Sequence, residues 1–409
     1  MTLDCSHFIP YHSSPSELDI PVQWLYVKKQ LNLISLIINP ILEVQLYVLE
    51  NNSTLYELID NPDEQVTIKA IHKGQNGKAI RHLKHPSLHL QKLVMLEFKE
   101  YIQYIDTPDE SIQLMAVEFN PKLLLLIKKP TKTVQMKALS QNGSLMMLMK
   151  DVPECLEIQA VALSTFGLAI QVLEAPNQNL QEIAVKNNGM ALEYIEFPFQ
   201  NVQLLAVQQN GMALEFIQNP IPETIQIEAV KQNGLAIQFI KDVLPSETVQ
   251  FLAVKQNPLA FKYLKAPISE IIQWEAVTAN PFTIKYILDP SQTLKEMAIK
   301  KDPDSLLLIN IIDPETHEHL EEMAVSQNGL TLQYIKNPTQ KMIETSISQN
   351  GNALAYVPKS LHTNELKEKA LEQTGHAIRF IEYQDEKLIE LSNQSLKRDK
   401  IRRTAKALN

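Results

Sequence analysis

The sequence is poor in the residues that reactive sites and membrane segments need. It has only two cysteines, ten glycines and two tryptophans among 409 residues. Cys5 and Cys155 show no zinc-type or redox spacing and support a disulfide only weakly, so a reducing cytoplasm is expected. No apolar run approaches the roughly 18 residues that span a bilayer, and no signal-like basic and apolar regions follow Met1. Neither secretion nor membrane insertion is therefore expected.

Recognisable catalytic motifs are also missing. There is no phosphate loop, nucleophile elbow or zinc-protease motif, and the glycines are too regularly spaced for a nucleotide fingerprint. Four histidines gather in one stretch, but neither a cysteine nor a carboxylate completes a metal shell there. They are His72, His82, His85 and His89. We therefore expect no catalytic residue, no metal and no cofactor, and a protein that is not an enzyme.

Internal repetition, by contrast, runs through most of the chain. Four near-copies follow one another from Ala184, Ala206, Ala229 and Ala253, and they read AVKNNGMALEYIEFP, AVQQNGMALEFIQNP, AVKQNGLAIQFIKDV and AVKQNPLAFKYLKAP. With that first alanine as position zero, the register extends in steps of 22 to 26 residues to sixteen units, anchored from Tyr26 to Ala370. Self-similarity at such a period predicts a repeat architecture.

The apolar spacing within a unit is helical. Positions −4, 0 and +1 mark one face of a first helix, and positions +7, +8, +10 and +11 mark a face of a second. Position +4 is Asn or Asp in most units and precedes Gly or Pro at +5, which predicts an N-cap followed by the first residue of the second helix. Because Pro replaces Gly at +5 in several units, this position does not require a left-handed glycine.

These features predict an all-α fold, a right-handed-type α-solenoid of about sixteen helical hairpins of 22–26 residues. Helices this short are marginal in isolation, so stacking of neighbouring hairpins must supply the core. The expected organisation is an N-terminal segment over residues 1–15, a single repeat array over residues 16–381, and a capping helix with a basic tail over residues 382–409.

The consensus A-V-x-x-N-G-x-A-L-x-x-I resembles a family of short two-helix repeats that is known only as a domain of unknown function and occurs in bacterial and large-virus proteins. The likeness is strongest over residues 184–357, fair over 112–183 and weakest before Val66. It implies a helical repeat fold. It brings no established activity and no catalytic residue to this chain.

Three ladders of side chains recur through the units: Gln at −3, Asn at +4 and an aromatic residue at +10. We interpret the aromatic ladder as core packing. We interpret the Gln and Asn ladders as helix capping and as hydrogen bonds between neighbouring turns. The alternatives are a stacking platform for bases and a set of amides that read the polar edges of a ligand.

Charge is unevenly distributed in a chain of net charge −9. Residues 151–250 carry twelve acids against three lysines, whereas the basic stretches 65–95 and 121–150 lack any acid. Position +9 is polar in many units and changes freely between them, which is how repeat proteins acquire partners. The candidate interaction surface consists of Lys69, Lys73, Lys78, Arg81, Lys84, Lys92, Glu193, Glu215, Gln238, Lys262 and Lys285.

The favoured function is a non-enzymatic scaffold that binds a protein partner along a superhelical groove. The alternative is a solenoid that binds nucleic acid or nucleotides through the two basic stretches. Net acidity argues against the alternative, and local fluctuation of a solvated surface also explains such stretches. No membrane partner is expected.

Overall fold

The computed structural model describes residues 19–83, 85–218, 220–241, 243–309 and 314–407. The predicted N-terminal segment 1–15, Cys5 and Lys84 lie outside the described residues. The chain divides into two compact parts, Met1–Val202 and Gln203–Asn409, each of which contains several repeats. We call them the first unit and the second unit. Throughout the described ranges all regular structure is helical, and no strand is present. The chain is an all-α repeat solenoid, as the sequence predicts.

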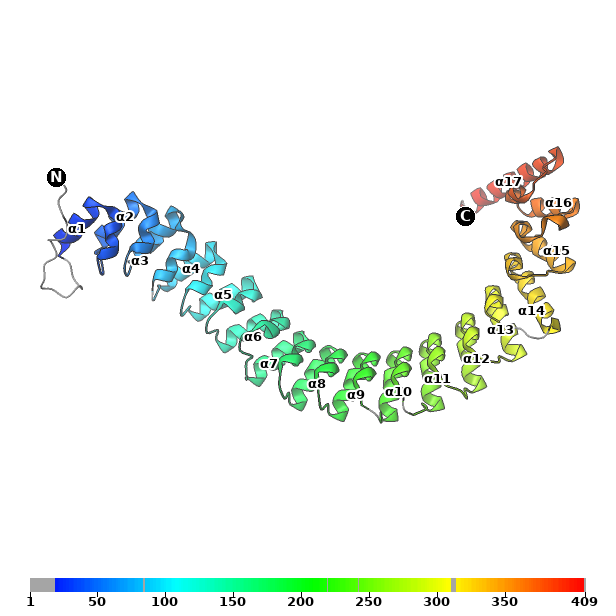
Figure 1. Ribbon diagram of the computed structural model, residues 1–409, viewed down its shortest axis with the longest axis horizontal. Coiled ribbons are helices and arrows are strands. Elements are labelled where there is room, and N and C mark those ends of the chain that lie inside the picture. Colours follow the sequence, from blue (N-terminus) through cyan, green and yellow to red (C-terminus); the bar gives the residue numbers. More distant parts are fainter. Residues whose placement is uncertain (1–18, 84, 219, 242, 310–313, 408–409) are drawn as a thin grey trace, which may run out of the picture. The chain divides into compact units, whose positions relative to one another are not determined.

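The first unit consists of short α-helices that alternate with 3₁₀-helices, and each α-helix lies beside the next (Figure 1). One π-helical segment, η4, lies between α3 and η5. The elements are α1 (Ile20–Lys29), η2 (Leu31–Leu36), α2 (Leu42–Asn51), η3 (Ser53–Leu58), α3 (Glu64–Ala70), η4 (Ile71–Gln75), η5 (Asn76–His82), α4 (Leu88–Glu97), η6 (Lys99–Tyr104), α5 (Glu110–Phe119), η7 (Pro121–Leu126), α6 (Lys132–Gln141), η8 (Gly143–Leu148), α7 (Leu156–Thr165), η9 (Gly167–Val172), α8 (Gln178–Asn187) and η10 (Gly189–Tyr194).

The second unit continues the same alternation and ends on one longer helix. The unit boundary falls inside its first helix, α9. The elements are α9 (Gln200–Gln209), η11 (Gly211–Phe216), α10 (Glu223–Gln232), η12 (Gly234–Phe239), α11 (Glu247–Gln256), η13 (Pro258–Tyr263), α12 (Glu270–Ala279), η14 (Pro281–Tyr286), α13 (Gln292–Lys301), η15 (Pro303–Leu308), α14 (Pro314–Gln327), η16 (Gly329–Tyr334), α15 (Gln340–Gln349), η17 (Gly351–Tyr356), η18 (Lys359–Leu361), α16 (Asn364–Gln373), η19 (Gly375–Phe380) and α17 (Glu386–Ala407).

The predicted register is confirmed, because sixteen α/3₁₀ pairs occupy the described ranges, from α1/η2 to α16/η19. The second helix of each pair is not an α-helix. In most pairs it is a six-residue 3₁₀-helix, as in η10. A helix this short gains little from α-type bonds, and its hydrogen bonds close over three residues instead: Ile195 N–H donates to the Leu192 carbonyl at 3.2 Å.

One asparagine joins the two helices of a pair, as Asn188 illustrates. Its N–H donates to the Ala184 carbonyl at 2.9 Å and so ends α8, while its side-chain oxygen accepts from Met190 N–H at 3.0 Å and so caps η10. The extended backbone of Asn188, with φ −147° and ψ 110°, makes the turn between them. The predicted N-cap at +4 is therefore confirmed, and it caps a 3₁₀-helix.

The core of each unit lies between the α-helices and the 3₁₀-helices. Positions −4, 0 and +1 are buried as predicted, for example Val44, Val48 and Leu49 in the first unit. In the second unit, Ile272, Ala276 and Val277 occupy the same positions. Positions +7, +8 and +11 of the 3₁₀-helices complete the core. A period of three residues per turn places +8 and +11 on one face.

Glycine at +5 is required by close packing rather than by backbone conformation. A Cβ at Gly234 would lie 2.2 Å from the Ala253 carbonyl oxygen of the next α-helix, and one at Gly351 would lie 2.2 Å from that of Ala370. Neither glycine has a positive φ, as the presence of proline at this register predicts. In η13, Pro258 takes this position as the first residue of the helix.

The glutamine ladder at −3 connects successive repeats. Gln113 donates to the Pro108 carbonyl of its own loop at 2.9 Å and accepts from Thr131 N–H of the next loop at 3.2 Å. Gln91 makes the same two bonds, to Pro86 and from Asp109. These bonds confirm the predicted contacts between neighbouring turns. They satisfy loop backbone groups that the stacking buries.

The last helix, α17, closes the second unit. Its Ser392 hydroxyl donates to the Gly375 carbonyl at 2.9 Å, so α17 takes the place of a further repeat helix against η19. The sequence predicts a polar helix over residues 385–391 and a basic tail beyond it. The structure instead continues the helix to Ala407.

Candidate interaction surface

The 3₁₀-helices present one outward column of side chains in each repeat. With three residues per turn, positions +6, +9 and +12 lie above one another, opposite the buried column at +5, +8 and +11. In η13 this outward column holds Leu259 and Lys262, both exposed, and it continues into exposed Lys265. The 3₁₀ layer thus offers side chains to a partner without unpacking the core.

The candidate residues at +9 lie in this outward column. Glu193 belongs to η10 of the first unit, whereas the other four follow one another on successive, mutually contacting 3₁₀-helices of the second unit. All are exposed except Gln238, which is half-buried. The four are Glu215, Gln238, Lys262 and Lys285. Along this row of the second unit, charge therefore changes from acidic through neutral to basic.

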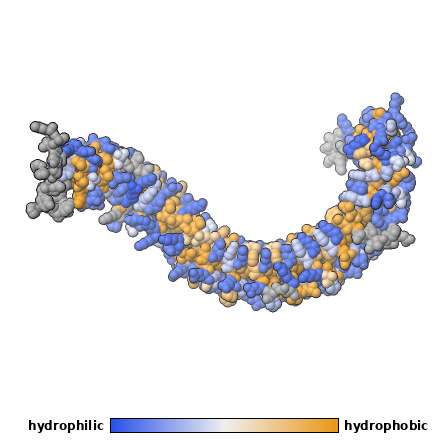
Figure 2. Space-filling model, viewed as in Figure 1, coloured by the Kyte–Doolittle hydropathy of each residue, from blue (hydrophilic) through white to orange (hydrophobic). Residues whose placement is uncertain are grey.

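The side chains at +10 form an apolar row that the expectation of core packing does not describe. In the second unit none of them is fully buried; Tyr286 is 38% exposed and Tyr356 is 43% exposed. They lie at the carboxyl ends of their 3₁₀-helices, where the three-residue turn rotates +10 away from +8 and +11. Figure 2 shows apolar side chains that reach the surface between charged ones. The row consists of Phe216, Phe239, Tyr263, Tyr286, Leu308, Tyr334, Tyr356 and Phe380.

Cations at +9 pack on several of these rings. The Lys262 ammonium lies 4.5 Å from the centroid of the Tyr263 ring, and the Lys285 ammonium lies 4.9 Å from that of Tyr286. A hydrogen bond with the Tyr263 side chain is the main cause that raises the pKa of Lys262. The two positions thus act as one surface, with a ring beside a cation in each of these repeats.

The candidate cations of the stretch 65–95 are distributed over several elements. Lys69 of α3 pairs with Glu50 at 2.5 Å, and Arg81 of η5 pairs with Glu57 at 2.7 Å. The Lys73 ammonium lies 3.4 Å from the Glu50 carbonyl oxygen, while Lys78 and Lys92 are exposed. Each paired carboxylate belongs to the preceding repeat, so stacking neutralises charge that the sequence alone leaves unbalanced.

Three of the six lysines in the stretch 121–150 are paired in the same way. They pair with acids of neighbouring repeats: Lys128 with Asp106, Lys132 with Glu157, and Lys137 with Glu118. All of these pairs are exposed, so their contribution to stability is small. Their effect on the surface is larger, because they weaken the positive potential that a phosphate backbone needs.

The histidine-rich stretch does not form a cluster. His82 is half-buried, its ring packs edge-on against Tyr56 at 5.5 Å, and burial lowers its pKa. His72, His85 and His89 are exposed. Within the described ranges, no three His, Cys, Asp or Glu side chains come together as a metal ion would require. Cys155 is a half-buried free thiol.

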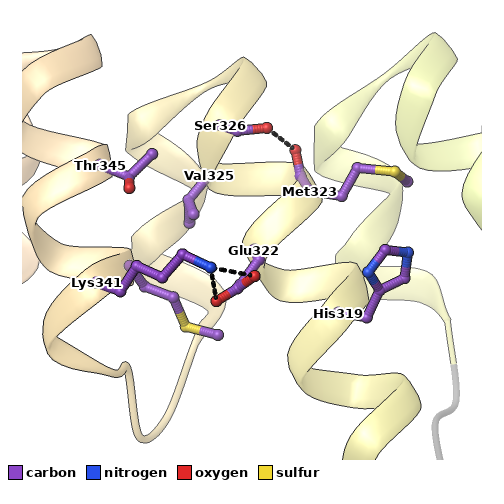
Figure 3. Close-up of a pocket in the computed structure, with 8 residues that line it drawn as sticks. His319, Glu322, Met323, Val325, Ser326, Lys341 and Thr345 are labelled. Atoms are coloured by element: carbon purple, nitrogen blue, oxygen red, sulfur yellow. Dashed lines mark hydrogen bonds and ion pairs between the residues drawn. The ribbon is translucent and has the colours of Figure 1, made fainter.

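The α layer carries a shallow depression of about 340 Å³ between α14 and α15 (Figure 3). Lys341 of α15 reaches back to both carboxylate oxygens of Glu322 on α14, at 2.9 and 3.0 Å. At its edge, His319 Nε2 lies 3.5 Å from Glu296 of α13. Its charged groups thus pair across repeats, and the depression is open to solvent.

Comparison of the chain with protein-family models, with curated proteins and with solved structures finds no match. In the part of the chain that the structure describes, no helix has the length and apolar character needed to cross a membrane. A role for this all-α repeat solenoid must therefore be argued from its surfaces.

Proposed function

We propose that this chain is a non-enzymatic interaction scaffold that holds an extended segment of a partner protein along its 3₁₀ layer. The observation that carries the proposal is the apolar row at +10 in the second unit, one large half-exposed side chain per repeat. A regular row of half-exposed apolar side chains is typical of interaction sites. Aromatic side chains are also enriched where interfaces gain most of their affinity.

The repeat geometry suits an elongated partner. Successive 3₁₀-helices from η11 to η17 contact one another, so equivalent side chains recur at regular intervals along the layer. The core positions stay constant while +9 changes from repeat to repeat, so recognition can vary without loss of packing. The proposal places the protein in the cytoplasm, in keeping with a cysteine content of two and the free thiol of Cys155.

Site-specific photocrosslinking in the cells that express the protein tests the proposal. A photoreactive residue at Tyr263 or Tyr286 is expected to capture one defined protein. The same residue at Ile271, an exposed apolar position on α12, is the matched control and is expected to capture none. The purified partner should then bind the chain and lose affinity for the Y263S/Y286S variant. Absence of a crosslink at the row, or equal capture at Ile271, would overturn the proposal.

Nucleic-acid binding through the basic stretches is the less favoured function. Lys69, Arg81, Lys128, Lys132 and Lys137 are each paired with a carboxylate. A phosphate backbone would have to displace those acids. Salt-sensitive binding of RNA or DNA, lost in a K78Q/R81Q variant, would favour this alternative.

A further inference from the structure

Four exposed lysines of the second unit have no acidic partner in the described part of the chain, unlike the paired cations of the basic stretches such as Lys69 and Lys128. Lys241 and Lys265 follow η12 and η13 at position +12, and Lys262 and Lys285 occupy +9 of η13 and η14. In the described ranges, no carboxylate lies within ion-pair distance of any of them. Together with Tyr263 and Tyr286 they form what we call the Lys-Tyr patch.

The lysines of the Lys-Tyr patch are held near one another by the stacking of repeats. The Lys265 ammonium lies 3.4 Å from the carbonyl oxygen of Lys241 in the preceding repeat. Lys262 packs on Tyr263 of η13, and η13 contacts η14, where Lys285 packs on Tyr286. Like charges that lie on adjoining repeats without a paired acid favour an anionic partner.

Exposed aliphatic side chains lie beside the cations. Val243 is 62% exposed and Leu244 is 55% exposed. Both line a depression of about 130 Å³, together with Tyr263, and Lys241 and Lys265 flank it. A complementary partner must therefore offer both negative charge and an apolar side chain.

We propose that the Lys-Tyr patch binds an acidic peptide segment of a partner protein, with Asp or Glu side chains against the lysines and one aliphatic or aromatic anchor over Val243 and Leu244. This inference rests on the proposed scaffold function and specifies the chemistry of the segment. The charges along the row at +9 also set the direction in which the peptide binds. Acidic residues of the peptide lie over η13 and η14, and its opposite end meets Glu215 of η11.

Charge and shape favour a peptide over a single-stranded nucleic acid. Val243 and Leu244 offer no aromatic face on which a base could stack. The rings of Tyr263 and Tyr286 already carry a lysine each. A phosphate backbone that followed the row would meet Glu215, whereas a peptide can change its charge along its length.

The test uses the full chain and a random peptide library displayed on phage. Peptides enriched on the wild-type chain are expected to combine Asp or Glu with Leu, Ile, Phe or Trp. Their affinity should fall about tenfold or more on K262E/K285E, and it should also fall at high salt. K255E/K300E, which makes the same charge change at exposed lysines of α11 and α13, is the matched control and should bind as the wild type does.

The outcomes separate this inference from the proposed function. Peptides that lack acids but lose affinity in Y263S/Y286S would overturn the inference and leave the scaffold proposal standing. Acidic peptides that bind K262E/K285E as well as the wild type would also overturn the inference. Oligouridylate could instead bind more tightly than any selected peptide and lose this binding in K262E/K285E. That result would overturn the inference in favour of nucleic-acid binding. Failure of both peptide selection and photocrosslinking would overturn both proposals.

Discussion

The backbone N–H of Gly234 donates a hydrogen bond of 2.6 Å to Oε1 of Gln256, which belongs to the next repeat. This N–H is the first of a 3₁₀-helix and has no partner within that helix. The same bond links Gly211 to Gln232 at 2.6 Å and Gly329 to Gln349 at 2.9 Å. In these repeats a residue at +3 thus caps the 3₁₀-helix of the repeat before it, and the bond links each of them to its successor.

Repeats with proline at +5 explain why the residue at +3 of the next repeat varies. Pro258 and Pro281 have no N–H to be capped, and Ala279 and Lys301 stand at +3 of the repeats that follow them. Where glycine at +5 supplies an N–H, the residue at +3 of the next repeat carries an amide or a hydroxyl. Where proline at +5 supplies none, the residue at +3 of the next repeat is free to change. The pair +5 and +3 therefore forms one structural unit across the repeat boundary.

Replacement of Gln256 by Ala is expected to destabilise the second unit by about 1–3 kcal/mol, because the buried N–H of Gly234 loses its acceptor. Urea denaturation measures the loss, and faster hydrogen exchange at the Gly234 amide locates it. Gln327→Ala is the control. Gln327 occupies +3 of the repeat after that of Pro303, and Pro303 has no N–H for its side chain to cap. Equal losses in the two variants would show that the side chain acts by some route other than this hydrogen bond.

Gly234→Ala is expected to cost about 1–3 kcal/mol, since the added Cβ would lie 2.2 Å from the Ala253 carbonyl oxygen and would force α11 away. Pro303→Ala is the matched control at the same register, because a Cβ is already accommodated there. Its stability should change by less than about 1 kcal/mol. Both are measured by urea denaturation. A Gly234→Ala variant as stable as the wild type would contradict the close-approach explanation.

The regularity of the chain made much of the fold predictable, since an error in one unit is corrected by its neighbours. The sixteen anchors, the asparagine caps such as Asn188 and the glutamine contacts such as that of Gln113 all follow from residue type at a fixed position. Each is a local requirement: a buried apolar face, an orphan N–H or an unpaired carbonyl.

Other features depend on geometry that residue type does not specify. Tyr286 looks like a core residue at α-helical spacing, but a 3₁₀ turn places it half outside. The pairing of Lys128 with Asp106 needs residues that are 22 positions apart in sequence to face each other across a repeat boundary. In the sequence, the Gly234–Gln256 bond leaves one signal, which is that the residue type at +3 depends on whether +5 of the preceding repeat is glycine or proline. That signal appears only when the two kinds of repeat are compared.

The glutamine ladder allows a comparison between two positions of the first unit. Gln113 bonds both its own loop and the next, whereas Gln135 bonds only the Pro130 carbonyl, and its Oε1 is buried without a partner. Gln113→Ala is therefore expected to cost about 1–3 kcal/mol, and Gln135→Ala is expected to cost less. Urea denaturation measures both, and a larger loss at Gln135 would contradict this account of the ladder.

Tyr56 predicts a dependence of stability on alkaline pH. Its buried hydroxyl lies 2.8 Å from Thr67 Oγ1 and donates to the Ala79 carbonyl at 3.1 Å, and burial raises its pKa to about 12. The unfolded chain loses this proton near pH 10 while the folded chain keeps it, so the contribution is complete below about pH 10 and is lost as pH rises toward about 12.

Tyr56→Phe should lower the free energy of unfolding at about pH 8 by about 1–3 kcal/mol, because Ala79 and Thr67 lose their partner. The difference from the wild type should narrow by about 1 kcal/mol at about pH 11, since only the wild type then loses the contribution of this proton. Tyr383→Phe, at an exposed position, is the control and should follow the wild type at both values. A difference between Tyr56→Phe and the wild type that stays constant across this range would show that Tyr56 ionises in the folded chain as readily as in the unfolded one.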